Sequence, residues 1–293
     1  MTAWAAIGAA HLDRIARAQG SVALGSSNPA EVTTAPGGVA RNVAENLARL
    51  GSDVRLVSRV GDDDAGRLVL SATRNAGVNV SKVEIIPGAS TAGYTALLDP
   101  AGGLVVAFAD MAIYDGFNVE RLVEVAADAP RWFVDANLPA STLAALAARK
   151  PHDTFFAADA VSVPKSERLH GILPALDLLF VNLDEARALA RVSDPEAAAR
   201  RLRAEGVDAV VITLGAEGAL VAGSDGTATL ASYKAEAGDV TGAGDALIGA
   251  TLDALAGNRP LIPSVRRGIA AAALTIAHPG AVRPDLASAL KAI

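Results

Sequence analysis

The sequence contains no cysteine, which excludes disulfides, thiolate metal sites and a cysteine nucleophile. Positive charge is also in the minority, because 26 lysines and arginines stand against 32 aspartates and glutamates, a formal net charge of −6. A chain with this acidic balance is not expected to bind nucleic acid or an anionic membrane, a local basic patch aside. We therefore expect its partners to be small molecules.

The N-terminus lacks a long hydrophobic run. Its apolar stretch, Ala3 to Ala10, has only eight residues and no basic region ahead of it. It is therefore too short to span a membrane and unlike a secretory signal. Metal-ligand spacing is missing as well, since the four histidines lie far apart. These absences favour a cytoplasmic protein whose first apolar stretch is a buried strand.

No low-complexity linker or fixed-period repeat divides the 293 residues. Short apolar runs instead alternate with alanine-rich amphipathic segments. This pattern is typical of an α/β fold with a doubly wound, mostly parallel sheet and helices on both faces. The runs that predict buried strands are residues 3–9, 54–60, 131–136, 154–159, 178–182 and 209–214.

Two regions break this alternation. Residues 20–35 and 83–108 indicate short strands and turns without a helix, and the second contains the hairpin signal Asp-Pro-Ala-Gly-Gly. We expect these insertions to pair into a small β-sheet of the right size to form a lid. Because an isolated sheet has exposed edges, we also expect a homodimer through the lid, with residues 93–98 as the contact.

The stretch GDVTGAGDAL, residues 238–247, places three glycines and two aspartates directly before an apolar run that indicates a helix. The first amides of a helix lack internal partners and, with the helix dipole, bind phosphate. Gly242 and Gly244 would let a phosphoryl group approach the backbone without a Cβ in the way. Asp245 at the rim can accept a proton from an attacking hydroxyl. The alternative is a tight turn capped by Thr241.

A second glycine pair, Gly37 and Gly38, also precedes a predicted helix. Asn42 lies one turn into that helix, and its amide can both donate to and accept from sugar hydroxyls. Asp13 follows the first strand, at the edge where α/β folds bind ligands, so its carboxylate can orient two hydroxyls. The alternatives are an ordinary loop before an amphipathic helix and a surface aspartate.

Two further motifs lie at predicted strand ends. Asn182 with Glu185 three residues on has the spacing of a capping box, and Glu185 would equally help to place a hydrated Mg²⁺. Thr213, Gly215 and Gly218 lie at a strand–turn–strand junction, which is explained either by a hairpin or by a neighbouring ATP. Walker and Rossmann glycine motifs are missing at the positions where they would be expected.

Together these motifs resemble the PfkB (ribokinase-like) carbohydrate kinases. Residues 239–245 resemble the family's C-terminal signature, and residues 36–51 resemble its N-terminal glycine signature. The resemblance implies one ribokinase-like domain over residues 1–293, with lid insertions at about 20–35 and 83–108, and a kinase that uses ATP and Mg²⁺. Other family-like elements are residues 58–66, 134–138, 182–185 and 213–218.

The resemblance also implies roles for single residues. Asp245 would be the base that deprotonates the substrate hydroxyl, and the amides of Gly242, Ala243 and Gly244 would form the anion hole. Asp239 would match a ligand for a monovalent cation such as K⁺. The sugar would be bound by Asp13, Gly37, Gly38 and Asn42, and the nucleotide and magnesium by Asn182, Glu185, Thr213, Gly215, Gly218 and Thr241.

Within the family, the segment GGVARN looks like the pseudouridine kinases, as does the segment at residues 161–169. We therefore expect phosphorylation of the 5′-hydroxyl of a ribose-bearing nucleoside, pseudouridine first, with Arg41 reaching past the ribose to the base. A solvated Arg41 is the alternative. The rival functions are another sugar or nucleoside kinase and a non-catalytic sugar-binding regulator, and ATP consumption would separate them.

Overall fold

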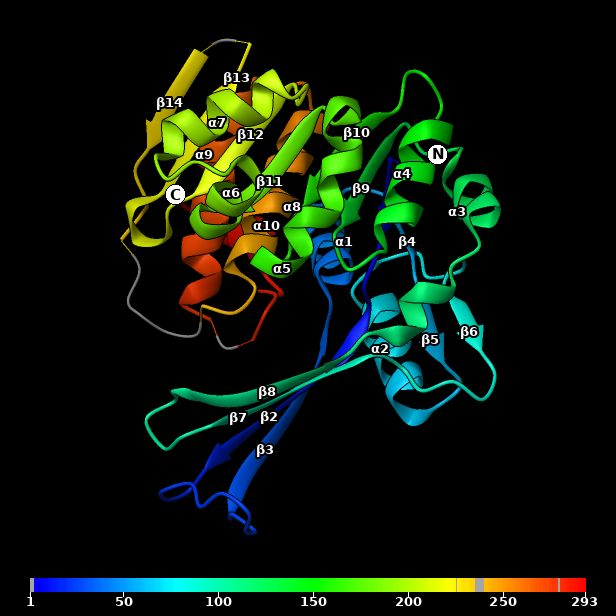
Figure 1. Ribbon diagram of the computed structural model, residues 1–293, viewed down its shortest axis with the longest axis vertical. Helices are drawn as coiled ribbons and strands as arrows, with labels where there is room; N and C mark the ends of the chain where they lie inside the picture. The colour runs from blue at the N-terminus through cyan, green and yellow to red at the C-terminus, as the bar shows by residue number, and fades with distance from the viewer. Residues whose placement is uncertain (1–2, 225, 235–239, 279) are drawn as a thin grey trace.

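The computed structural model describes residues 3–224, 226–234, 240–278 and 280–293. Its centre is a sheet with the strand order β14-β13-β12-β11-β10-β9-β1-β4 (Figure 1). The run from β12 to β4 is parallel, and β13 and β14 join it at one edge in antiparallel orientation. The strands of this central sheet are β1 (Trp4–Ile7), β4 (Val54–Val57), β9 (Arg131–Asp135), β10 (Phe155–Asp159), β11 (Leu178–Asn182), β12 (Ala209–Thr213), β13 (Ala219–Gly223) and β14 (Gly226–Leu230).

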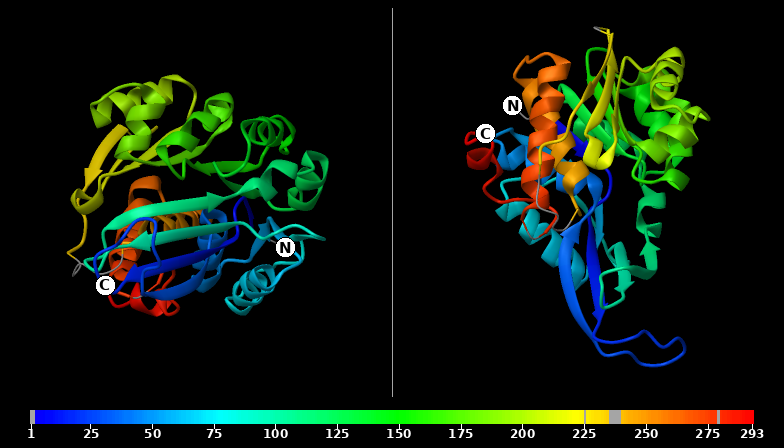
Figure 2. Two further views of the ribbon diagram at one scale, coloured as in Figure 1. Left: turned by 60° about the horizontal axis from the view of Figure 1, so that its bottom comes forward. Right: turned by 90° about the vertical axis from the view of Figure 1, so that its left-hand side faces the viewer.

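Helices cover both faces of the central sheet (Figure 2). Side chains of a strand alternate between two hydrophobic cores, so that in β1 Ala5 and Ile7 pack on one side and Trp4 and Ala6 on the other. The first core is closed by α3, α4, η2, α6 and α7, and the second by α1, α2, α8 and α9. This is the doubly wound α/β fold that the sequence predicts.

The helices are α1 (Val39–Arg49), α2 (Asp64–Asn75), α3 (Val119–Ala126), α4 (Ala140–Arg149), α5 (Val163–Ser166), α6 (Leu183–Ala190), α7 (Pro195–Ala204), α8 (Ala243–Ala256), α9 (Leu261–Ile276) and α10 (Leu286–Ala289). Three short 3₁₀ segments, η1 (Ala112–Gly116), η2 (Glu167–Ala175) and η3 (Gly215–Glu217), join them in the described part of the chain. Within that part, none of the helices combines the length and apolarity that crossing a bilayer requires.

One predicted strand is divided in the structure. We expect a single strand over residues 54–60, but β4 stops short and β5 (Arg59–Gly61) pairs with β6 (Glu84–Ile86) in a separate two-stranded sheet. Between them lies Ser58, a buried residue whose hydroxyl donates to the carbonyl of Gly8 at 2.6 Å. This hydrogen bond satisfies a buried polar group at the point where the chain leaves the central sheet.

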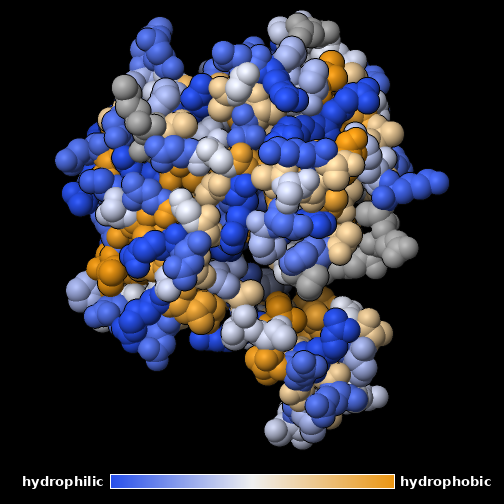
Figure 3. All heavy atoms as spheres, turned by 180° about the vertical axis from the view of Figure 1, so that it is seen from behind, coloured by the Kyte–Doolittle hydropathy of each residue, from blue (hydrophilic) through white to orange (hydrophobic). Residues whose placement is uncertain are grey.

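A second, four-stranded sheet stands apart from the body, and we call it the projecting sheet (Figures 1 and 3). Its strand order is β3-β2-β7-β8, and most of its residues are at least partly exposed. It therefore has no core of the kind that closes both faces of the central sheet. Its strands are β2 (His11–Ala18), β3 (Ala30–Gly37), β7 (Gly93–Leu98) and β8 (Leu104–Asp110).

The small separate sheet that the sequence predicts is present, and β3, β7 and β8 lie largely within the two expected insertions, but β2 does not. The expected insertions begin at about residues 20 and 83, whereas the whole of β2 lies before the first of them. At the start of the second, β6 pairs with β5 rather than with the projecting sheet. Asp13 follows β1, as expected, and lies within β2, where it pairs with Ala35 and Tyr94.

Candidate active site

The polar residues of the candidate site meet at the carboxyl edge of the central sheet. Asp135, Asp159, Asn182 and Thr213 are the last residues of β9, β10, β11 and β12, which are neighbours in the sheet. Asp135 is in register with Asp159, and Asn182 with Thr213. Open α/β sheets bind their ligands at this edge. A cavity of about 180 Å³ lies there, and its lining includes Asp159, Asn182, Glu185, Thr213, Gly244 and Asp245.

Helix α8 carries Asp245 to this cavity in its first turn. We expect the helix over residues 246–255, and it begins slightly earlier, with Gly242 as N-cap. Gly242 has a φ of 78°, and a Cβ there would lie 1.9 Å from the carbonyl oxygen of Ala281, so the backbone itself requires glycine. At Gly244 a Cβ would meet nothing within 4 Å. Only Gly244 therefore leaves open space beside the base.

The backbone amides at the start of α8 are not equally available to bind an anion. The amide of Ala243 donates to the carbonyl of Val240 at 3.2 Å, so it is engaged in a turn. The amide of Gly244 lies in the first helical turn, where intrahelical partners are missing by geometry. Thr241 is exposed and is not placed in the cavity lining. Asp239 lies outside the described residues.

The glycine pair before α1 makes room for other parts of the protein. A Cβ on Gly37 would lie 2.1 Å from Oδ2 of Asp13, and one on Gly38 would lie 2.3 Å from the carbonyl oxygen of Ala9. Gly38 also has a φ of 101° and serves as the N-cap of α1. Gly38 therefore lets the start of α1 pack on the segment that follows β1, and Gly37 leaves room for the Asp13 carboxylate.

Asp135 fixes this packing, and sequence reasoning assigned it no role. Its Oδ2 accepts hydrogen bonds from the amides of Ala9 and Ala40, both at 2.9 Å, and its Oδ1 accepts from the amide of Asn137 at 2.9 Å. The carboxylate is fully buried, and Gly8 leaves the space that it fills. The segment VDANL was the available signal, but only the sheet register shows what its aspartate holds together.

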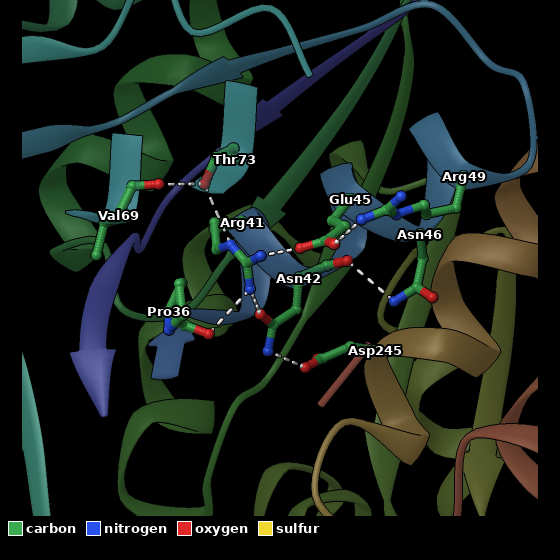
Figure 4. Close-up of polar contacts among 9 residues, drawn as sticks. All are labelled: Pro36, Arg41, Asn42, Glu45, Asn46, Arg49, Val69, Thr73 and Asp245. Carbon is green, nitrogen blue, oxygen red and sulfur yellow. Dashed lines mark hydrogen bonds and ion pairs between the residues drawn. The ribbon is translucent and has the colours of Figure 1, made fainter. Parts of the chain in front are cut away.

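Asn42 on α1 and Asp245 on α8 are brought into contact by close helix packing. Nδ2 of Asn42 donates to Oδ2 of Asp245 at 2.7 Å (Figure 4). One turn further along each helix, a Cβ on Gly249 would lie 2.5 Å from Cβ of Asn46, so glycine permits this approach. The predicted sugar-binding amide and the predicted base are thus hydrogen-bonded to each other.

Burial changes the protonation of the carboxyl groups in this region. Removal from water raises the pKa of Asp245 to about 6, and the nearby carboxylates Asp135 and Asp13 add to the rise, while the Asn42 hydrogen bond opposes it. Burial, with the charges of Glu185 and Asp245, raises the pKa of Asp159 well above its usual range. Burial also raises the pKa of Glu185. Such a group of carboxyls favours a bound cation, which would offset their repulsion.

Glu185 serves as a cap and also lines the cavity. Its Oε2 accepts from the amide of Asn182 at 2.8 Å, and Oδ1 of Asn182 accepts from the amide of Glu185 at 2.9 Å, which completes a capping box on α6. The cap uses one oxygen of the carboxylate, and the residue also lies in the lining of the cavity. The capping prediction is therefore confirmed, and the magnesium role stays a prediction.

The third glycine motif forms a hairpin between β12 and β13. Thr213, the last residue of β12, lines the cavity, and Gly215 opens η3. Gly218 has a φ of 106°, and a Cβ there would lie 2.0 Å from the carbonyl oxygen of Leu230 at the end of β14, so the turn and its packing against β14 require this glycine. The structure therefore brings Thr213 to the cavity and leaves Gly218 with a structural explanation.

Arg41 does not lie where we expect a residue that reads the base of a nucleoside. Its guanidinium is buried and hydrogen-bonded to Pro36, Asn42, Glu45 and Thr73 (Figure 4). Because the side chain is buried and four of its five N–H donors are taken by the protein, this geometry does not support the expected contact with the base. Asp13 is accompanied instead by His11, whose Nε2 lies 3.1 Å from the Asp13 carboxylate.

Known proteins share this architecture. The model of the pfkB family carbohydrate kinases matches residues 1–287. The pseudouridine kinase of Escherichia coli (strain K12) is 31% identical over 97% of this chain and 93% of its own. A solved carbohydrate kinase from Agrobacterium tumefaciens is 36% identical, with a TM-score of 0.84 over 100% of this chain and 96% of its own.

The Arabidopsis thaliana ribokinase, solved in complex with ribose and ATP, has a TM-score of 0.87 over 99% of both chains, and its 20% identity shows a shared fold. Further relatives are named as kinases of other nucleosides and sugars.

This fold, with its ligand edge and helix-borne carboxylate, is that of phosphotransferases whose acceptor is an alcohol group. The chain belongs to the pfkB family of carbohydrate kinases, as the match over residues 1–287 and the 31% identical relative show. It is a kinase of the sugar and nucleoside class.

Proposed function

We propose that the protein transfers a phosphoryl group from ATP to the 5′-hydroxyl of a ribose-bearing nucleoside, with pseudouridine as the preferred substrate. The observation that carries the chemistry is the position of Asp245, partly buried at the start of α8 and hydrogen-bonded to Asn42. The substrate is supported by the 31% identical pseudouridine kinase and by the segment GGVARN.

In the proposed reaction Asp245 takes the proton of the substrate hydroxyl. The oxygen of that hydroxyl forms a bond to the γ-phosphorus of ATP, the bond to the bridging oxygen breaks, and ADP leaves. A base with a pKa of about 6 is ionised at neutral pH and still basic enough to accept a proton. The helix start, including the amides of Gly242, Ala243 and Gly244, would stabilise the charge on the transferred group. For Ala243 this requires its turn hydrogen bond to Val240 to open or to be shared.

ATP would lie along the cavity toward Asn182 and Thr213, with the open space at Gly244 beside its phosphates. Mg²⁺ would be held, partly through water, by Glu185, and we add Asp159, which sequence reasoning did not single out. Oxygen ligands of this kind fit the ion, and it would neutralise charge on the phosphates. A K⁺ site at Asp239 stays a sequence-based proposal, which an assay in K⁺ against Na⁺ tests.

The projecting sheet would close over the sugar and join two subunits. Its outer strand β8 exposes Leu104 by 61% and Phe108 by 66%, and β3 exposes Val32 by 61%. Figure 3 shows hydrophobic surface on this part of the molecule. Exposed apolar strands favour pairing with a second copy. The contact would then lie on β8 rather than on β7, whose 93–98 segment is flanked on both sides within the sheet. Light scattering that shows a monomer at micromolar concentration would refute the dimer.

A panel of acceptors tests the substrate. The protein is assayed for ADP release with pseudouridine, uridine, cytidine, inosine, ribose and no acceptor, with the Asp245→Asn variant as control. We expect the highest kcat/KM for pseudouridine, since a polar group left unpaired by the wrong base costs about 5- to 150-fold. A better rate with ribose would refute the nucleoside assignment and keep the kinase. If none of the acceptors supports ATP turnover, the result would favour the non-catalytic alternative.

A further inference from the structure

Arg41 occupies a buried position behind the candidate base. Its Nη1 donates to the carbonyl oxygen of Pro36 at 2.9 Å and to Oδ1 of Asn42 at 2.6 Å, and its Nε donates to Oγ1 of Thr73 at 3.2 Å. Its Nη2 donates to the carboxylate of Glu45. The guanidinium thus joins the start of α1 to α2 and to the end of β3 (Figure 4).

These contacts determine which way the Asn42 amide points. An arginine side chain has only donors, so the Asn42 atom that faces Arg41 must be the carbonyl oxygen. The amide nitrogen then faces Asp245, where it donates to Oδ2 at 2.7 Å. A reversed amide would place its oxygen against an ionised carboxylate and its NH₂ against a guanidinium, and both contacts would be repulsive.

The guanidinium is itself held in place on several sides. Glu45 also accepts from Arg49 at 3.1 Å, and the Thr73 hydroxyl donates to the carbonyl oxygen of Val69 at 2.7 Å. The main-chain carbonyl of Asn42 accepts from Nδ2 of Asn46 at 2.9 Å. Because these partners are themselves held by other hydrogen bonds, the Arg41 guanidinium is restricted to one orientation, and this orientation determines which way the Asn42 amide points.

We infer that Arg41 is a positioning residue for the catalytic base. It holds the Asn42 amide so that Nδ2 of Asn42 binds Oδ2 of Asp245, and Oδ1 of Asp245 is left for the substrate hydroxyl. This inference rests on the proposed function of Asp245 as base. It gives Arg41 a place in catalysis without contact to the substrate, and it gives Asn42 a second role besides sugar binding.

The inference predicts a change at Asp245 when Arg41 is replaced. The charged groups that act on Asp245 are Asp13 on β2, Asp135 on β9, Asp159 on β10 and Arg41 on α1. In Arg41→Met the amide is no longer held from the other side, so its hydrogen bond to the carboxylate is weakened, and a nearby positive charge is lost. Both changes disfavour the ionised form, so the pKa of Asp245 should rise by about half a unit or more.

The experiment measures this pKa in two ways. The first is the acid limb of kcat against pH with the best acceptor and saturating ATP. The second is a ¹³C NMR titration of the Asp245 carboxyl in the free protein, assigned by its disappearance in Asp245→Asn. Arg49→Met is the matched control, because Arg49 binds the same Glu45 but not Asn42. Arg41→Lys is included in case Arg41→Met does not fold.

We expect both measurements to move upward together in Arg41→Met and in Arg41→Lys, whose ammonium cannot bridge the same partners. We also expect kcat to fall about tenfold at pH 7 while KM for ATP changes little. Arg49→Met keeps the contacts of Arg41 with Asn42, Pro36 and Thr73, so it should shift both measurements much less than Arg41→Met does. An unshifted NMR titration in a folded Arg41 variant overturns the inference. If no acceptor is phosphorylated by the wild-type protein, the proposed function fails, and the NMR titration still decides whether Arg41 orients the amide.

Discussion

The strands of the projecting sheet are longer than those of the central sheet, six to eight residues against four or five, and their surroundings are opposite. In the central sheet Phe133 on β9 is fully buried between helices, whereas Phe108 on β8 of the projecting sheet is 66% exposed. The same residue type therefore serves a core in one sheet and a surface in the other. We infer that the central sheet provides most of the stability of the molecule. It also carries most of the candidate site, because the polar residues that end β9 to β12 belong to it.

The strongest test of this comparison replaces Asp245, the candidate base beside the carboxyl edge of the central sheet. Asp245→Asn keeps the shape of the side chain and cannot accept a proton, so kcat should fall roughly 10²- to 10⁴-fold, the usual contribution of a general base. KM for the nucleoside should change little. Steady-state kinetics at pH 8 measure the effect. Turnover within a factor of three of wild type would remove Asp245 from the mechanism.

A second test removes the Phe133 side chain from the hydrophobic core of the central sheet. Phe133→Ala would leave a cavity between the central sheet and its helices, which costs about 3–5 kcal/mol of unfolding free energy. Chemical denaturation with urea, followed by circular dichroism, gives this value. A loss below about 1 kcal/mol would show that the central sheet is not the stable part of the molecule.

Much of the body could be predicted from the sequence, because strands buried on both faces are continuous apolar runs. The sequence does not predict β2, because HLDRIARA is neither a continuous apolar run nor a strict polar–apolar alternation, and it follows β1 directly. Residues whose roles depend on contacts across the chain were missed as well. Asp135 binds Ala9 and Ala40, far away in sequence, and Gly249 looks like any small residue of an apolar helix until α1 is packed against it.

A third prediction concerns the charge of Glu185 at the carboxyl edge. Glutamine also completes a capping box, so Glu185→Gln removes the charge and keeps the cap on α6. We expect the Mg²⁺ concentration for half-maximal activity to rise about 10- to 100-fold, with an unchanged melting temperature. Titration of Mg²⁺ at fixed ATP measures the first quantity. A lower melting temperature with unchanged magnesium dependence would assign Glu185 to capping alone.

The pH dependence of the reaction offers a fourth test. Burial raises the pKa of Asp245 to about 6, and only the ionised carboxylate accepts a proton. Activity should therefore be constant well above pH 6, half-maximal near pH 6 and about tenfold lower for each further pH unit of acidification. The profile of kcat from pH 4.5 to 9 checks this, on samples whose fold is confirmed at each pH. An acid limb near pH 4 would mean that the base is not desolvated.

The smallest effect is expected in the projecting sheet, where Phe108→Ala is the counterpart of Phe133→Ala. Phe108 has little burial to lose, so the unfolding free energy of the subunit should change by no more than about 0.5 kcal/mol. Denaturation must be compared at several protein concentrations, because a dimer that buries Phe108 would add a loss that grows with concentration. A concentration-independent loss of several kcal/mol would show that the projecting sheet has a core of its own. A concentration-dependent loss would instead locate the subunit contact on β8.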